Sequence, residues 1–171
     1  MIASILRAKR QDARVLTSLA QLAKRHWGYP EDWLRLWRPA LTITPRFIAS
    51  HPVYSVQRDD GEALGFYALS QRGTRLDLEH LWVHPQRLRS GIGTRLFRHA
   101  VATARRRHGR LLTIASDPNA EGFYRRCGAR RVGEVDSVPA GRRLPVLHVR
   151  LGRAPKRTGR RPPRTTRAHS R

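Results

Sequence analysis

Residues 76–94 read LDLEHLWVHPQRLRSGIGT, and this stretch decides the fold. The run from Leu76 to Val83 predicts a largely buried strand, and the His-Pro pair that follows ends it. Gly91 and Gly93 then stand at the start of a helical pattern. Glycines let the backbone approach a ligand closely, and a helix N-terminus presents free N–H groups and a positive dipole end. The stretch therefore predicts a phosphate-binding turn between a strand and a helix.

The rest of the chain alternates between strand and helix patterns on both sides of this stretch. Asp12 is expected to cap the first helix, and Trp33 and Trp37 share one face of the second. Strands and helices in this order predict an α/β or α+β domain with helices covering the faces of a sheet. The expected strands are 2–6, 53–57, 64–69, 76–83, 111–115, 130–135 and 145–151, and the expected helices are 12–28, 30–38, one that begins near 91, and 117–128.

The length and charge of the chain suggest one domain with a basic tail. At 171 residues, the chain suits a single domain, expected at residues 1–152. The net charge is +23, from 35 Lys and Arg against 12 Asp and Glu. Residues 153–171 are rich in Arg and Pro and have no core-forming residue, so a disordered tail is expected there. It either binds nucleic acid non-specifically or is only solvated, and an arginine bias in coding would explain the charge as well.

Three classes of protein are disfavoured by what the sequence lacks. No apolar run approaches the roughly 18 residues that span a bilayer, and the start lacks a secretory signal, which predicts a cytoplasmic protein without membrane contact. The single cysteine, Cys127, allows no internal disulfide, and its place on an apolar helix stripe disfavours a role as nucleophile. His80 and His84 would lie roughly 13 Å apart on a strand, so no metal site is expected.

A second motif lies downstream, where residues 119–129 read NAEGFYRRCGA. Together with the strand, loop and helix of residues 78–93, in this order and spacing, it resembles the GNAT (Gcn5-related) N-acetyltransferase family. The close match covers about residues 76–135, and residues 1–70 agree only in the order of helices and strands. The resemblance implies a single domain with a mixed, mostly antiparallel sheet flanked by helices on both faces. It also implies transfer of an acetyl group from acetyl-CoA to a primary amine by direct attack.

Acetyl-CoA is the co-substrate that this resemblance implies, and other nucleotide sites fit the glycines less well. No Gly-Lys-Ser/Thr follows to form a P-loop, and no third glycine completes a dinucleotide-binding fingerprint. The family usually has Gln or Arg three residues before the first glycine, where this chain has Leu88, so that contact is either absent or made by Arg87 or Arg89. Asn119 is also expected to cap its helix. The cofactor-binding residues implied are Leu81, Trp82, Val83, Arg87, Arg89, Ser90, Gly91, Ile92, Gly93, Thr94 and Asn119.

Three side chains are candidates for the proton transfers that amide formation needs. Asp77 and Glu79 are two residues apart on one strand, so both carboxylates are expected on the same face, opposite to His80 and Trp82. Glu79 is favoured as the general base, with Asp77 second, and a solvated or salt-bridged carboxylate is the alternative for both. Tyr124 matches the family's tyrosine near the CoA sulfur, which implies a general acid; a core aromatic is the alternative.

The acceptor amine is expected near the first two helices. There, Trp27, Tyr29 and Trp33 accompany two acidic residues, a combination that can hold an ammonium group by cation–π contact and by charge. The alternative is that Trp33 and Trp37 form the buried stripe of the second helix. The acceptor would be a small-molecule or peptide amine, and an acetyltransferase for protein lysines or N-termini is the alternative enzyme. An inactive basic module that binds nucleic acid is the alternative from another class, and either a monomer or a homodimer is compatible with the sequence.

Overall fold

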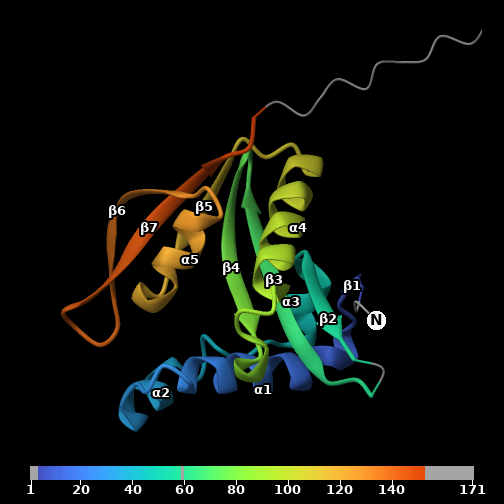
Figure 1. The fold of residues 1–171 in the computed structure, drawn as a ribbon, viewed down its shortest axis with the longest axis vertical. Helices are drawn as coiled ribbons and strands as arrows, with labels where there is room; N and C mark the ends of the chain where they lie inside the picture. The colour runs from blue at the N-terminus through green and yellow to red at the C-terminus, as the bar shows by residue number, and fades with distance from the viewer. Residues whose placement is uncertain (1–3, 59, 153–171) are drawn as a thin grey trace, which may run out of the picture.

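A seven-stranded sheet forms the centre of the computed structural model, which describes residues 4–58 and 60–152 (Figure 1). Its order is β1-β2-β3-β4-β5-β7-β6, and β4 and β5 are its parallel pair, so the expected mixed, mostly antiparallel sheet is confirmed. The expected basic tail, 153–171, lies outside the described residues. The strands are β1 (Ile5–Arg7), β2 (Val53–Gln57), β3 (Ala63–Arg72), β4 (Arg75–Val83), β5 (Leu111–Ala115), β6 (Arg130–Ser137) and β7 (Arg142–Arg150).

The parallel pair separates after a short contact. β4 and β5 are paired only from Arg75 to Asp77 and from Leu111 to Thr113. Beyond Asp77, β4 stays paired with β3, whereas β5 and the β6–β7 hairpin diverge from it, as Figure 1 shows. The edge of β4 from Leu78 to Val83 therefore has no strand on its β5 side within the described sheet. Backbone groups along such an edge remain available to a ligand.

Helices α1 to α3 cover one face of the sheet. The buried residues of α1 recur three and four apart, as an amphipathic helix requires, and pack with α2 and α3 against Val53, Phe66 and Ala68. Thr44 caps α3 by accepting a hydrogen bond from the N–H of Phe47 at 3.0 Å. The elements on this side are a 3₁₀ turn η1 (Arg10–Asp12), α1 (Ala13–Arg25), α2 (Glu31–Trp37) and α3 (Pro45–Ser50).

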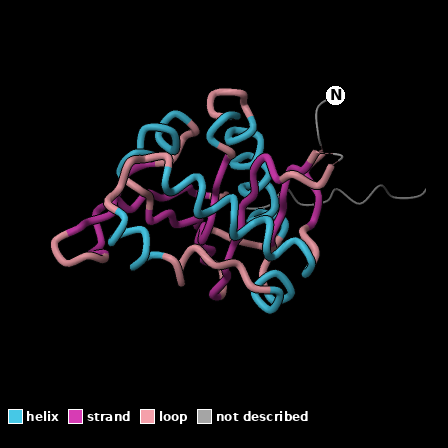
Figure 2. Tube along the Cα trace, turned by 90° about the horizontal axis from the view of Figure 1, so that it is seen from below, coloured by secondary structure: helices cyan, strands magenta, loops and turns pink. Residues whose placement is uncertain are grey.

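Helices α4 and α5 cover the opposite face, so the strands lie between two helical layers (Figure 2). Leu96 and Phe97 of α4 are almost fully buried against β3, β4 and β5. Gly65 on β3 allows this close packing, because a Cβ there would lie 2.8 Å from the Cδ1 atom of Leu96. The elements that follow β4 on this side are a 3₁₀ turn η2 (Pro85–Arg87), α4 (Ile92–Arg106), a 3₁₀ turn η3 (Pro118–Ala120) and α5 (Glu121–Arg126).

Several expectations about local structure are wrong in detail. Asp12 does not cap α1; its carboxylate accepts a hydrogen bond from the N–H of Lys9 and closes the preceding 3₁₀ turn. The segment expected to form one helix at 117–128 is divided into η3 and α5. Asn119 does not cap a helix either, because Asp117 is the cap of η3 and accepts from the Asn119 N–H at 3.0 Å. Helix α3 has no counterpart in the sequence-based expectations.

A β-bulge at Glu79 reverses the alternation of side chains along β4. Glu79 has no partner on β3, because Leu78 and His80 are paired with consecutive residues of that strand. Leu81 consequently packs on the same side as Leu78, against the core under α4. His80 and Trp82 pack on the opposite side, near the core under α1. The expectation that these two residues face away from both carboxylates is therefore wrong, since strict alternation does not extend through the bulge.

Candidate active site

A cleft of about 890 Å³ lies where β4 and β5 separate. This volume is within the range of about 300–1,000 Å³ that is typical of ligand pockets. One wall comes from the second half of β4, the following loop and the first turn of α4. The other walls come from the end of β5, η3, α5, the C-terminal end of α1, part of α2 and the β6–β7 hairpin. Segments far apart in the sequence therefore meet around one cavity.

The loop between β4 and α4 is shaped to bind an anion. Gly91 precedes α4 with φ = 85°, a left-handed conformation that suits glycine, and Arg89 has φ = 63°. The first hydrogen bond of the helix runs from the Arg95 N–H to the Gly91 carbonyl at 3.0 Å. The N–H groups of the first three helical residues therefore have no partner within the helix. With Arg87 and Arg89 lining the cleft beside them, these groups fit a phosphate.

Nine of the eleven residues expected to bind the cofactor line the cleft. Ser90 and Ile92 do not: the Ser90 hydroxyl donates to the Arg87 carbonyl, and Ile92 packs into the core. Leu88, at the position where the family usually has a polar side chain, also lines the cleft and is 40% exposed. The nine residues are Leu81, Trp82, Val83, Arg87, Arg89, Gly91, Gly93, Thr94 and Asn119.

The two carboxylates of β4 have different surroundings. Glu79 lines the cleft, and its carboxylate accepts a hydrogen bond from the hydroxyl of Ser70 on β3 at 2.5 Å. Asp77 is absent from the cleft lining and forms an ion pair with Arg75, in which Nε and Oδ1 are 3.2 Å apart. Only Glu79 of this pair is therefore positioned to reach a molecule in the cleft.

Tyr124 forms part of the cleft wall with only 6% of its surface exposed. Its ring packs edge-on against Phe97 and Phe123, with centroids 5.5 and 5.1 Å away. Burial raises the pKa of the Tyr124 hydroxyl, and the nearby Cys127 and Asp117 raise it further. The hydroxyl is therefore protonated at neutral pH and able to donate a proton or a hydrogen bond. This position is compatible with a packing role and with a role as general acid.

His80, which the sequence disfavoured as a metal ligand, also lines the cleft. Burial, together with a smaller effect of the nearby His51, lowers the pKa of His80 to about 4, so the ring is neutral at pH 7. Its Nδ1 accepts a hydrogen bond from the indole N–H of Trp82 at 3.1 Å. Because Trp is only a donor, the proton of the neutral ring is assigned to Nε2. His80 is therefore a neutral hydrogen-bond donor through Nε2 and a poor general base.

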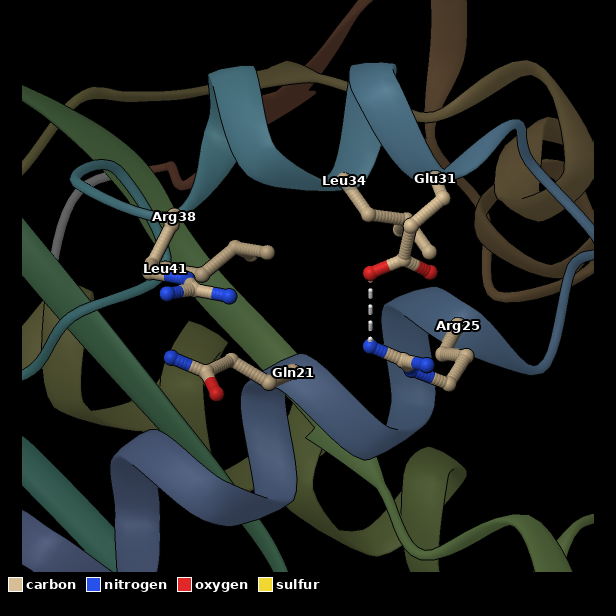
Figure 3. A pocket seen from close by; sticks show the side chains of 6 residues that line it. All are labelled: Gln21, Arg25, Glu31, Leu34, Arg38 and Leu41. Atoms are coloured by element: carbon tan, nitrogen blue, oxygen red, sulfur yellow. Dashed lines mark hydrogen bonds and ion pairs between the residues drawn. The ribbon is translucent and has the colours of Figure 1, made fainter.

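The residues expected to hold the acceptor are separated by the fold. Trp27 lines the cleft, whereas Tyr29 and Trp33 do not and stack on each other with centroids 6.0 Å apart. Glu31, one of the two acids expected to attract an ammonium group, forms an ion pair with Arg25 at 3.2 Å. Figure 3 shows this pair at a separate hollow of about 20 Å³ between α1 and α2. That hollow holds about one water molecule and no substrate.

Three buried charged residues at the cleft were missed in the sequence. Lys24 of α1 and Arg142 of β7 both form ion pairs with Asp117, which follows β5. Their side chains are 9%, 9% and 11% exposed, and all three line the cleft. The signal in the sequence that could have revealed this cluster is Lys24, which follows Ala20 by four residues and so lies on the apolar face of α1. A lysine at a core position of a helix indicates a buried partner or a functional role.

Other kinds of site find no support in the part of the chain that the structure describes. It contains no cluster of three or more His, Cys, Asp or Glu residues that would hold a metal ion. Cys127 lies outside the cleft, and burial raises the pKa of its thiol. Among the described helices, none has the length and apolar character needed to cross a membrane.

Solved structures of several acetyltransferases share this fold. The chain is 16% identical to paia N-acetyltransferase from Thermoplasma acidophilum, whose structure contains coenzyme A; the TM-score is 0.72, over 88% of this chain and 99% of the other. A GCN5-related N-acetyltransferase from Rhodopseudomonas palustris is 18% identical with a TM-score of 0.71, over 88% of this chain and 96% of the other. The ribosomal-protein-S18-alanine N-acetyltransferase from Escherichia coli is 15% identical with a TM-score of 0.65, over 90% of this chain and 97% of the other. Identities this low establish a common fold only.

The chain therefore has the fold of these acetyltransferases. A family model described as "Acetyltransferase (GNAT) family" matches residues 16–129, which is more than half of the chain. This chain belongs to the GNAT acetyltransferase family.

Proposed function

We propose that this chain transfers an acetyl group from acetyl-CoA to a primary amine by direct attack of the amine on the thioester. The observation that supports this proposal is the cleft, which joins the N-terminus of α4, the open edge of β4, Glu79 and Tyr124. The coenzyme A bound to the paia relative agrees with a nucleotide in such a cleft, although that relative is similar only in fold.

The residues of the cleft fit acetyl-CoA. The free N–H groups of the first turn of α4, with Arg87 and Arg89, would hold the pyrophosphate. The open edge of β4 from Leu81 to Val83 would offer backbone groups to the pantetheine arm and to the thioester oxygen, where negative charge develops. Acetyl-CoA supplies the activated acetyl group, and the protein supplies its orientation and the proton transfers.

Two side chains would move the protons. Glu79 would accept the proton that the amine loses as the new C–N bond forms, and Ser70 would hold its carboxylate in place. Tyr124 would donate its proton to the sulfur as the C–S bond breaks. An assay of free thiol released from acetyl-CoA with a panel of amines and peptides tests the activity. Peptide acceptors alone would favour the protein acetyltransferase, and RNA binding without thiol release would favour the inactive module.

Saturating acetyl-CoA is expected to raise the thermal stability of the protein. A ligand that binds only the folded state at 100 times its Kd stabilises that state by about 2.7 kcal/mol. A thermal melt with and without acetyl-CoA measures the effect. A melting curve that acetyl-CoA leaves unmoved would overturn the assignment of the cleft to this co-substrate.

Thr94→Glu and Thr94→Gln are a matched pair of variants for the same measurement. Thr94 is the third residue of α4 and lines the cleft. An acidic residue in the first turn suits the helix dipole, so Thr94→Glu should fold, but its charge repels phosphates. Thr94→Gln has nearly the same shape without the charge. Acetyl-CoA is expected to stabilise Thr94→Glu much less than Thr94→Gln, and equal stabilisation would argue against a phosphate at this turn.

Tyr124→Phe is expected to lower kcat on the order of 10²-fold while the Kd for acetyl-CoA changes little. Phenylalanine keeps the packing against Phe97 and Phe123 and removes only the proton donor. Tyr67→Phe is the matched control, because the Tyr67 hydroxyl is also buried but bonds His99 and Thr103, and Tyr67 is not part of the cleft lining. A kcat that falls equally in both variants would make Tyr124 a packing residue.

A further inference from the structure

Lys24 and Arg142 form a cationic site around a single carboxylate. Both contact Asp117, and the distance from Arg142 Nη2 to Asp117 Oδ2 is 3.2 Å. The Lys24 ammonium also lies 4.3 Å from the centroid of the Trp37 ring and 4.7 Å from that of Tyr29. The Arg142 guanidinium lies 4.7 Å from the Trp37 centroid. The rings and the carboxylate fix the two cations at the wall of the cleft.

The charge of this site is not balanced. Two buried cations share one carboxylate, so one positive charge is left over. Glu79 is the other acid among the described residues that line the cleft, and its carboxylate is already bonded by Ser70. Burying a charge without a counterion is costly, so the site gains stability when an anion enters the cleft. Burial lowers the pKa of the Lys24 ammonium, and the charge of Arg142 lowers it further. Asp117 acts in the opposite direction but does not outweigh them, as expected where two cations lie close together.

Hydrogen-bond donors also remain at this site. Arg142 donates through Nη1 to the Ser137 hydroxyl at 3.1 Å and through Nη2 to Asp117 and, at 3.5 Å, to the Tyr29 hydroxyl. A guanidinium has five N–H groups and an ammonium three, more than these contacts use. The aromatic faces of Tyr29 and Trp37 are occupied by the protein's own cations, so a substrate ammonium group has no place there. The surplus donors and the surplus charge both suit an oxyanion.

We infer that the Lys24–Arg142 site binds a carboxylate of the acceptor, so that the acceptor class is an amino acid, with its amine directed to Glu79. This inference rests on the proposed acetyl transfer. Arginine matches the two oxygens of a carboxylate with parallel N–H groups, and such charge-assisted hydrogen bonds are among the strongest in proteins. An amine that lacks the carboxylate leaves the site without its anion.

The test compares amino acids with their primary carboxamides as acceptors for acetyl-CoA. The wild type is expected to have a kcat/KM about 10- to 100-fold higher for the acid than for its amide, the range expected for a charge-assisted hydrogen bond. Arg142→Gln should bring this ratio close to one, whereas Arg142→Lys should keep part of the preference. Arg142→Gln is expected to fold, because Lys24 and Asp117 then form a balanced pair.

A purely structural role gives a different result. Equal rates for acids and amides in the wild type, or an equal loss for both in Arg142→Gln, would overturn the inference. A thermal melt with each acid or amide in the presence of CoA provides a second measurement that needs no turnover. There, the acids should stabilise the wild type more than the amides, and Arg142→Gln should abolish the difference. If none of the amines causes release of thiol from acetyl-CoA, the result counts against the proposed function. The thermal melts would still decide whether the site binds a carboxylate.

Discussion

Asp117→Asn is expected to lower the free energy of unfolding by about 3–5 kcal/mol, the range measured when one partner of a buried ion pair is removed. The substitution leaves the buried cations of Lys24 and Arg142 without a carboxylate. Asparagine has the same shape and caps a helical turn as well as aspartate does, so η3 should remain intact. The loss therefore reports charge rather than local structure. Urea unfolding followed by circular dichroism measures it.

Two controls separate this effect from the loss of any single contact. Glu31→Gln breaks the exposed pair with Arg25 in Figure 3 and is expected to cost no more than about 1 kcal/mol. Lys24→Met in the Asp117→Asn background removes one of the two stranded cations, so the double variant should be more stable than the sum of the single losses predicts. Strict additivity would show that Asp117 and Lys24 do not act as a unit.

The pH dependence of stability should also report Asp117. Burial alone raises the pKa of its carboxyl group, but the hydrogen bond and charge of Lys24, with the Asn119 N–H and the Tyr29 hydroxyl, outweigh burial and hold the pKa below its ordinary value of 3.8. A carboxyl group whose pKa is lowered by folding stabilises the folded state at pH values above its pKa in the unfolded chain. This contribution disappears as the pH falls through its pKa in the folded protein. The wild type should therefore lose stability more steeply than Asp117→Asn below about pH 4.

The sequence predicted the strands and the long helices because their residues follow simple periods. The strand 111–115 agrees in both bounds with β5, and α4 has its apolar stripe at helical spacing. The missed helix α3 is only six residues long, and its signal is local, with Thr44 as cap and Pro45 in the first turn. Asp12 shows the opposite problem. A residue suited to capping is not obliged to cap, because a competing hydrogen bond to Lys9 occupies its carboxylate.

The candidate site was predictable where it depends on one continuous segment. The turn at Gly91 and the wall residue Tyr124 were found because their motifs are local in sequence. The Lys24–Arg142 site was missed because its two cations are 118 positions apart in the sequence, and no pattern within either segment relates them. The bulge at Glu79 was missed as well, since it arises from the pairing of β4 with β3 and leaves the apolar pattern of β4 nearly regular.

Glu79→Gln is expected to lower kcat/KM on the order of 10²- to 10⁴-fold at neutral pH, which is the usual contribution of a general base. Glutamine keeps the shape of the side chain and its bond with Ser70 but cannot accept the proton of the amine. Part of the loss should return at higher pH, as more of the amine is deprotonated in solution. Steady-state rates with an amine that the wild type accepts, measured across the pH range, provide the test.

Asp77→Asn is the comparison that decides the assignment of the base. Asp77 lies two residues from Glu79 on the same strand, but it pairs with Arg75 and does not line the cleft, so its loss should change the rate little. A larger loss for Asp77→Asn than for Glu79→Gln would move the base two residues along β4. Unimpaired rates in both variants would mean that water or the acceptor's own ionisation supplies the free amine. The cleft would then act only by orienting the two substrates, and the pH profile of the wild type should follow the pKa of the acceptor amine alone.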